Sequence, residues 1–331
     1  MSVFKPEVFQ GKMSYKRYFE GWYFKHVSKG MDYVCSIIPG ISLNPVNPHA
    51  FIQFINGLTG ETQYIEYPVS SFRFDKHRFS VQIGDSVFSA DSILLNIDSP
   101  LITVSGRLSY SGSIKYPASV FSPGIMGWYS FVPFMECKHG VVSVSHRIDG
   151  SLTINGTQVD FSGGKGYIEK DWGRSFPESW IWLQSNNFAN SDACIMMSIA
   201  KIPWLGSYFT GFLGFLYFNG IFYPFSTYNK SEITDISFQD ERLTLGFRSK
   251  KYRLIITTEL KNSGILLAPV SGEMSRHIKE SVDSELDVCL MDNKGVELYR
   301  DKAFRAGLEV IESIFEIVKV KGSTENRMAT F

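Results

Sequence analysis

The stretch FRFDKHRFSVQI, residues 72–83, decides the fold because its pattern returns as ISFQDERLTLGF at 236–247. The two segments lie 164 residues apart, and at that offset Phe79 falls on Leu243. In both segments apolar residues alternate with polar ones toward the C-terminal end. A period of two is typical of a β-strand with one buried face. We therefore predict strands at both places.

Three further segments repeat in the same order at similar offsets. They are EGWYFKH…VCSII (20–38) with SWIWLQS…CIMMSI (179–199), FIQFING (51–57) with GFLYFNG (214–220), and VSGRLSYSGSIKY (104–116) with VSGEMSRHIKES (270–281). The first of these matches pairs Trp22 with Trp182. Ordered matches at one period indicate a duplication. We predict an N-terminal unit at 1–165 and a C-terminal unit at 166–331.

Each unit consists of short alternating segments separated by Gly, Asn, Asp and Pro. This pattern predicts an all-β protein made of two tandem lipocalin-like antiparallel β-barrels. A barrel of this kind has room to enclose one apolar ligand. The segment RAGLEVIESIFEIVKV (305–320) fits either a terminal helix or a final strand.

Charge and composition narrow the class of partner. Lys+Arg and Asp+Glu both number 33, so we expect no binding to nucleic acid. Aromatic residues make up 15% of the chain, which favours strands and an apolar small-molecule ligand. The four cysteines are dispersed without metal-ligand spacing, and no secretory or transit-type signal is visible at the N-terminus. These features favour a cytoplasmic protein with reduced thiols.

The segment between Lys201 and Lys230 carries no charge and is long enough to span a bilayer. Asn219-Gly220 divides it, and this dipeptide is a strong signal for a two-residue β-hairpin. We therefore predict no transmembrane segment. The loop portions near 125–134 and 203–212 are expected to form an apolar surface or cavity mouth, with peripheral membrane contact.

The segment GYIEKDWGRSFPESWIWLQSNNF, residues 166–188, combines acids with three tryptophans. Glu169 and Asp171 alternate with Lys170, and we expect Trp172 on the face of the two acids. Paired carboxyl groups can divide the acid and base roles of a reaction. Alternatively, Asp171 caps a turn ahead of Gly173.

The following residues continue the same pattern. Trp180, Trp182 and Gln184 share one face of an expected strand, with Asn186 in phase. Tryptophan beside amides fits an apolar cavity with a few polar groups that orient a ligand. The alternative is that the tryptophans only plug the end of a barrel.

The segment YFEGWYFKH (18–26) holds a third candidate acid. On a strand, Glu20 and Trp22 share one face, whereas Tyr23 lies on the other. Burial beside aromatic rings raises the pKa of a carboxyl group and makes it a proton donor near neutral pH. Alternatively, Glu20 precedes the strand and pairs with Arg17 or Lys16.

The segment GWYSFVPFMECKHGVVSVSHRI (127–148) contributes His139 or His146, as a base or as a hydrogen-bond partner of a phenol. Alternatively, these are structural histidines with satisfied hydrogen bonds. His139 and His146 have no third residue at metal-ligand spacing, so no metal is expected. The chain has no GxSxG, P-loop or strand-flanked GxGxxG motif, and we expect no cofactor.

Three of these segments, EGWYFK (20–25), GIMGWYSFVPFMECKHGVVS (124–143) and GYIEKDWGRSFPESWIWLQSNNF, together resemble the tocopherol cyclase family. The resemblance implies cofactor-independent, acid-catalysed cyclisation of a prenylated hydroquinone to a chromanol. The plant members carry Asn where this chain has Asp171. The expected acids are Glu20, Glu169 and Asp171. The expected ligand-binding residues are Trp22, Tyr23, Trp128, His139, Trp172, Trp180, Trp182, Gln184 and Asn186.

Two other functions fit the same residues. One is a related alkene hydratase or isomerase. The other is a non-catalytic binding protein for a quinone, carotenoid or lipid, in which the aromatic cavity holds the ligand unchanged.

Overall fold

The computed structural model describes residues 3–204, 206–261 and 263–311. Within these ranges the chain forms antiparallel strands and short 3-10 turns, and no α-helix is present. This confirms the all-β prediction. The 3-10 turns are η1 (Val69–Ser71), η2 (Gly127–Phe131) and η3 (Thr227–Asn229).

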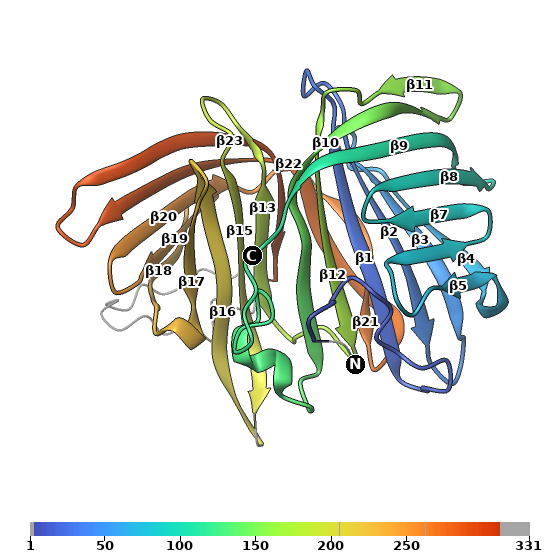
Figure 1. Ribbon diagram of the computed structural model, residues 1–331, viewed down its shortest axis with the longest axis horizontal. Coiled ribbons are helices and arrows are strands. Elements are labelled where there is room, and N and C mark those ends of the chain that lie inside the picture. The colour runs from blue at the N-terminus through green and yellow to red at the C-terminus, as the bar shows by residue number, and fades with distance from the viewer. Residues whose placement is uncertain (1–2, 205, 262, 312–331) are drawn as a thin grey trace.

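The strands form two sheets, which lie side by side in Figure 1. The first sheet contains β1 (Tyr18–Val27), β2 (Val34–Leu43), β3 (His49–Asn56), β4 (Thr62–Pro68), β5 (Phe72–Phe74), β6 (Ser80–Ile83), β7 (Ser86–Ser89), β8 (Ser92–Asp98), β9 (Thr103–Ile114), β10 (Cys137–Ile154), β11 (Thr157–Asp160) and β12 (Lys165–Gly173). The second sheet contains β13 (Trp180–Ser185), β14 (Asn187–Phe188), β15 (Cys194–Trp204), β16 (Ser207–Phe218), β17 (Ile221–Ser226), β18 (Glu232–Gln239), β19 (Arg242–Arg248), β20 (Tyr252–Glu259), β21 (Gly264–Val270), β22 (Glu273–Asp292) and β23 (Glu297–Val310).

The two sheets follow the same path. The first runs β4-β3-β2-β1-β12-β10-β9-β8-β7-β6-β5, and the second runs β17-β16-β15-β13-β23-β22-β20-β19-β18. In each sheet the last long strand pairs with the first, which agrees with an internal duplication. The chain passes from one sheet to the other between Gly173 and Trp180, so β12 belongs to the first sheet although it lies beyond residue 165. The division into domains at 165/166 stays a prediction.

Alternate residues of each strand fill a separate core under each sheet. Val81 lies in the first core and Leu245 in the second, which confirms the register of the 72–83 and 236–247 repeats. Trp22 and Trp182 behave differently. Trp22 lies in the first core, whereas Trp182 lies in a third cluster between the sheets. The predicted match of these tryptophans is therefore displaced by one residue, which turns a side chain to the opposite face.

The interior of the first sheet is filled by side chains. Trp22 stacks on Phe79 with 5.7 Å between ring centroids, and Phe24 and Phe88 are completely buried. These side chains pack closely against one another. The expectation that a barrel encloses the ligand stays a prediction, and the apolar cavity described below lies between the two sheets.

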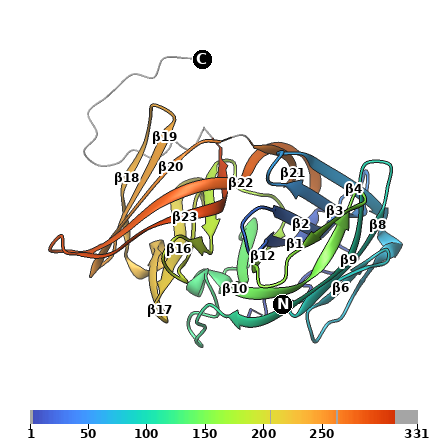
Figure 2. The ribbon, with the colours of Figure 1, turned by 90° about the horizontal axis from the view of Figure 1, so that it is seen from above.

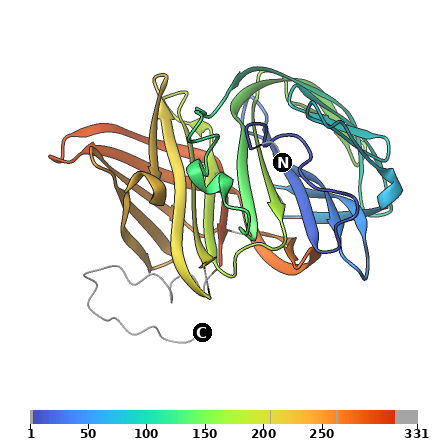
Figure 3. The ribbon, with the colours of Figure 1, turned by 60° about the horizontal axis from the view of Figure 1, so that its bottom comes forward.

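Two excursions of the chain close the space between the sheets. The β21–β22 hairpin of the second sheet reaches the first (Figure 2). There the Gln53 side-chain amide donates to the Leu267 carbonyl at 3.1 Å, and its oxygen accepts from the Leu267 N–H at 2.9 Å. The segment that carries η2 reaches the second sheet (Figure 3), and the Tyr228 hydroxyl donates to the Ile125 carbonyl at 2.8 Å. The cavity between the sheets thus receives walls from both units.

The uncharged segment forms the predicted hairpin. Strands β16 and β17 are joined by Asn219 and Gly220, both with positive φ, as a two-residue turn of this type requires. No helix among the described residues has the length and apolar character to cross a bilayer. Of the 305–320 segment, the part up to Val310 is a strand, and residues 312–320 lie outside the described ranges.

Candidate active site between the two sheets

The cavity encloses about 190 Å³ and is lined mainly by apolar side chains. Its walls come from β1, β2, β3, β10 and β12 of the first sheet and from β13, β15, β16, β21, β22 and β23 of the second. Pockets for drug-sized ligands enclose roughly 300–1,000 Å³. This cavity therefore has room for a ring and a short piece of chain, and a longer tail must leave through its mouth.

Aromatic residues from the two uncharged segments form that mouth, as predicted. Tyr129 stacks on Phe209 at 6.2 Å, and Trp204 lies 6.0 Å from Phe209 in an edge-on contact. Tyr129 and Phe209 line the cavity. Phe131 and Phe134, which follow Tyr129 in the sequence, are 49% and 58% exposed. The apolar cavity wall thus continues onto an apolar outer surface.

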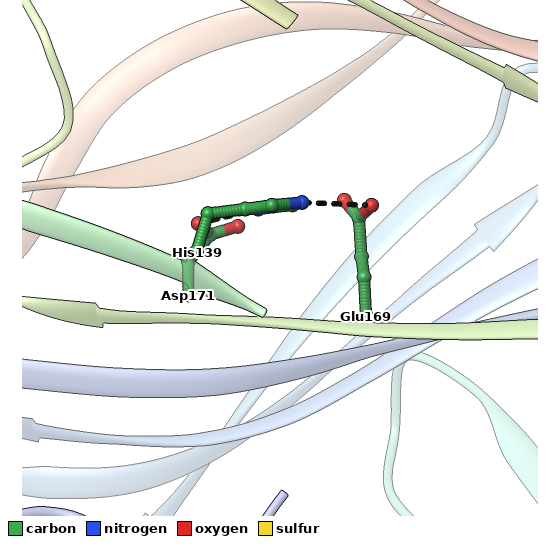
Figure 4. Close-up of side chains that lie close together, drawn as sticks. All are labelled: His139, Glu169 and Asp171. Carbon is green, nitrogen blue, oxygen red and sulfur yellow. Dashed lines mark hydrogen bonds and ion pairs between the residues drawn. The ribbon is translucent and has the colours of Figure 1, made fainter. Parts of the chain in front are cut away.

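Strand β12 places two of the predicted acids in the cavity wall. Glu169 and Asp171 are two residues apart and share the face that looks away from the first core. His139 of β10 stands opposite Asp171 in the strand register. Its Nδ1 lies 3.0 Å from Oδ1 of Asp171, and its Nε2 lies 3.5 Å from Oε2 of Glu169 (Figure 4).

Glu169 is the buried member of this group. Its Oε2 also accepts hydrogen bonds from the Tyr167 hydroxyl at 2.5 Å and from Nε1 of Trp182 at 3.3 Å. Burial raises the pKa of Glu169 to about 7, although attraction to His139 lowers it. At neutral pH the side chain therefore exchanges between the neutral and ionised forms, as a general acid or base requires.

Opposing effects act on His139. Burial lowers its pKa, but attraction to Asp171 and Glu169 is stronger in sum and raises the pKa to about 9. The imidazole is therefore charged at neutral pH. Donor atoms of His139, Glu169 and Asp171 all lie within 4.8 Å of one another, which is close enough for a metal ion. An imidazolium between two carboxyl groups accounts for the same geometry, and we do not assign these residues as metal ligands.

The second sheet contributes acids that the sequence analysis missed. Glu280 of β22 and Glu309 of β23 line the cavity and stand opposite each other. The Tyr23 hydroxyl donates to Oε1 of Glu280 at 2.6 Å, and Nε1 of Trp180 donates to Oε2 of Glu309 at 2.5 Å. The sequence feature that could have identified them is a single charged residue within an apolar run, as in AGLEVI around Glu309.

Three predicted residues lie on the wrong face for this cavity. Glu20, Trp22 and Trp172 point to the other side of the first sheet, because they occupy the strand positions that alternate with Tyr23 and Asp171. Trp172 therefore does not join the face of the two acids, as we expected.

Glu20 also has a different partner from those predicted. It is buried and forms an ion pair with Lys170, and it accepts hydrogen bonds from the backbone of Gln10 and Gly11. The Lys170 ammonium lies 4.8 Å from the ring centroid of Trp22. This group ties the N-terminal segment to the first sheet.

The remaining predicted residues divide between the cavity and its surroundings. Tyr23, Trp180 and Trp182 join His139 in the lining. Trp128 is 47% exposed on the outer surface and stacks on Tyr129. Gln184 and Asn186 are buried beyond the cavity. Gln184 Oε1 accepts from the Lys25 ammonium at 2.8 Å, and the Asn186 amide donates to the Gly166 carbonyl at 2.8 Å.

Two curled antiparallel sheets with an apolar, acid-bearing cavity between them define a lipocalin-like β protein. The family model described as tocopherol cyclase-like matches residues 113–311, which is more than half of the chain. The chain belongs to the tocopherol cyclase-like family.

Two curated relatives agree with this assignment, and a solved structure shares the fold. The chain is 27% identical over 115 residues to a probable chloroplastic tocopherol cyclase of Oryza sativa subsp. japonica, and 27% identical over 114 residues to the chloroplastic tocopherol cyclase of Zea mays. These matches cover 34% and 33% of this chain and 24% of each relative. A crystal structure of CghA with Sch210972 shares the fold, with a TM-score of 0.54, 13% identity and coverage of 89% of this chain and 88% of that one.

Proposed function

We propose that this protein catalyses the cofactor-independent, acid-promoted cyclisation of a prenylated hydroquinone, or a related prenyl lipid, to a chromanol. The observation that carries the proposal is Glu169, a carboxyl group with a pKa of about 7 in the wall of an apolar cavity. Family membership supports the type of reaction.

The reaction requires that one proton is added to the alkene and that one proton is removed from the phenol. A neutral carboxyl group gives its proton to the less substituted alkene carbon of the prenyl tail, which leaves a tertiary carbocation at the other alkene carbon. The phenol oxygen then forms a C–O bond to this cationic carbon, and the phenol proton passes to a carboxylate. Nothing is oxidised or reduced. Glu169 is the proposed acid, and Asp171 with His139 forms a hydrogen-bonded pair that orients the hydroquinone hydroxyl groups.

The cavity also suits the intermediate. Tyr23 and Trp182 contact each other edge to face at 5.3 Å, and both line the cavity. The faces of such rings stabilise a nearby cation, by roughly 2 kcal/mol or more when water is excluded. Trp180 adds a third ring to the same wall.

The mouth of the cavity supports peripheral contact with a lipid surface as the source of substrate. The cavity is too small for a long prenyl tail, and the exposed rings of Trp128, Phe131 and Phe134 extend the apolar wall outward. Exposed apolar patches beside a cavity are typical of membrane or lipid contact. In this arrangement the prenyl tail stays in the lipid while the hydroquinone ring enters the cavity.

Incubation of the purified protein with a prenylated hydroquinone, followed by chromatography and mass spectrometry, tests the proposal. Chromanol of unchanged mass is expected from the wild type, and Glu169→Gln should slow its formation by ~10²–10⁴-fold. A product heavier by one water would establish a hydratase instead. Bound but unchanged lipid would establish a carrier and contradict the cyclase assignment.

A further inference from the structure

The second sheet brings two glutamates together as direct neighbours in the cavity wall. Glu280 and Glu309 are paired in the β22–β23 register. Glu280 is completely buried, and its Oε1 accepts the hydrogen bond from Tyr23. Its Oε2 receives no hydrogen bond from any N–H or O–H donor in the described part of the chain.

The two carboxyl groups lie within hydrogen-bonding reach of each other. Two ionised carboxylates offer only acceptors, so this contact requires a proton on one of them. Burial and the charge of Glu309 raise the pKa of Glu280 well above its ordinary value. Burial raises the pKa of Glu309 to about 7, opposed by the hydrogen bond from Trp180. Glu280 therefore keeps the proton, and Glu309 is the member that titrates near neutral pH.

Other charged groups do not neutralise the pair. Within the described ranges, neither Glu280 nor Glu309 forms an ion pair. Lys25 of β1 attracts Glu280, but its ammonium is hydrogen-bonded to Gln184, and burial lowers its pKa to about 7. Glu169 of β12 adds a further negative charge when it is ionised.

The remaining charged neighbours are on β12, β10 and β22. Asp171 raises the pKa of Glu309 further, and His139 lies between Asp171 and Glu169 rather than beside the pair. The Arg276 guanidinium lies 5.0 Å from the ring centroid of Trp180. The Nε1 of the same indole donates to Glu309. A retained proton is therefore the means by which two acids remain together in this wall.

Trp182 connects the pair with Glu169. It stands opposite Glu309 in the β13–β23 register, and its indole Nε1 donates to Glu169. Trp182 is thus hydrogen-bonded to Glu169 and is the register neighbour of Glu309. This arrangement provides a proton donor and a proton acceptor at different points of the cavity wall.

We propose that Glu309, held in place by protonated Glu280, is the base that accepts the phenol proton during ring closure. This inference rests on the cyclisation proposed above. As the C–O bond forms, the phenol O–H bond breaks and its proton passes to the Glu309 carboxylate. The proton given to the alkene comes from Glu169, and between turnovers solvent takes the proton from Glu309 and returns one to Glu169. The protons therefore balance, and no oxidant or reductant is needed.

The first experiment needs no substrate. Infrared spectra at neutral pH should show a C=O band of protonated carboxylic acids, and part of this band should be lost in Glu280→Gln. Glu169→Gln is the matched control, which removes the contribution of the other cavity acid. A Glu280→Gln spectrum that retains the whole band would show that Glu280 is ionised and would overturn the inference, whether or not the protein is a cyclase.

The second experiment follows chromanol formation as a function of pH. Because Glu309 must be ionised to accept a proton, wild-type kcat should fall below about pH 7. Glu309→Gln should lower kcat by ~10²–10⁴-fold with little change in KM and remove this acidic limb. Glu280→Gln keeps a neutral donor beside Glu309, so the acidic limb of the kcat profile should remain in this variant.

A Glu309→Gln variant that is folded by circular dichroism and as active as the wild type would refute the base assignment. Loss of kcat with an unchanged acidic limb would also refute it, because a purely structural role would leave the limb in place. If the wild type binds the hydroquinone without cyclising it, the infrared band still reports the proton shared by Glu280 and Glu309. Such a result would contradict only the catalytic role of Glu309.

Discussion

Replacing Glu169 by Gln should stabilise the folded protein at pH 8 although it removes a group of the proposed active site. Burial raises the pKa of Glu169 from its ordinary 4.5 to about 7. The folded state therefore holds the proton more tightly than the unfolded chain. The contribution of Glu169 protonation to the free energy of unfolding is fully present below pH 4.5 and is lost as the pH rises through about 7.

The magnitude follows from the same shift. Each pKa unit corresponds to roughly 1.36 kcal/mol, so a rise from 4.5 to about 7 destabilises the fold at pH 8 by about 3 kcal/mol. Glutamine carries no charge and avoids this cost. About 3 kcal/mol is the upper limit of the gain, because the variant also removes one of the two acids that stabilise charged His139.

Urea denaturation monitored by circular dichroism at pH 5 and pH 8 measures the effect. The free energy of unfolding of Glu169→Gln minus that of the wild type should be larger at pH 8 than at pH 5, which means that the variant is relatively more stable at pH 8. Glu259→Gln, on the exposed side of β20, is the matched control and should change little between the two pH values. A Glu169→Gln variant that is relatively less stable at pH 8 would show that the site favours the ionised form, and the acid assignment would be refuted.

Three other changes test separate parts of the structure. Glu20→Gln should destabilise the fold by roughly 3–5 kcal/mol, measured by urea denaturation, because it leaves the buried Lys170 without its ion-pair partner. The rate of chromanol formation per folded molecule should not change. A loss of this rate without a loss of stability would restore Glu20 as a catalytic candidate. Gly307→Ala would place a Cβ 2.6 Å from the Trp182 ring, so chromanol formation and the indole fluorescence should both change, and wild-type behaviour would exclude a role for the ring position. Phe134→Ser should reduce flotation with phosphatidylcholine liposomes, whereas Val296→Ser, in the β22–β23 turn, should not; equal flotation of both variants would contradict lipid contact at the mouth.

Much of the fold was predictable because strand alternation and turn signals are local. The Asn219-Gly220 hairpin and the 72–83 and 236–247 repeats needed only the sequence, since backbone φ preferences and one-sided burial act within a few residues. Alternation also placed Glu169 and Asp171 on one face.

The choice of face and the composition of the site depended on tertiary structure. Alternation says which residues share a face but not which face meets the core, so Trp22 enters the first core while Tyr23 enters the cavity. Glu280 is 111 residues beyond Glu169 and reaches the same cavity only because the two sheets pack against each other. The sequence by itself determined the strands, their repeated order and the acids of β12. Only the packing of one sheet on the other decided that the cavity lies between the sheets, because the burial that raises the pKa of a carboxyl group comes from residues distant in the chain.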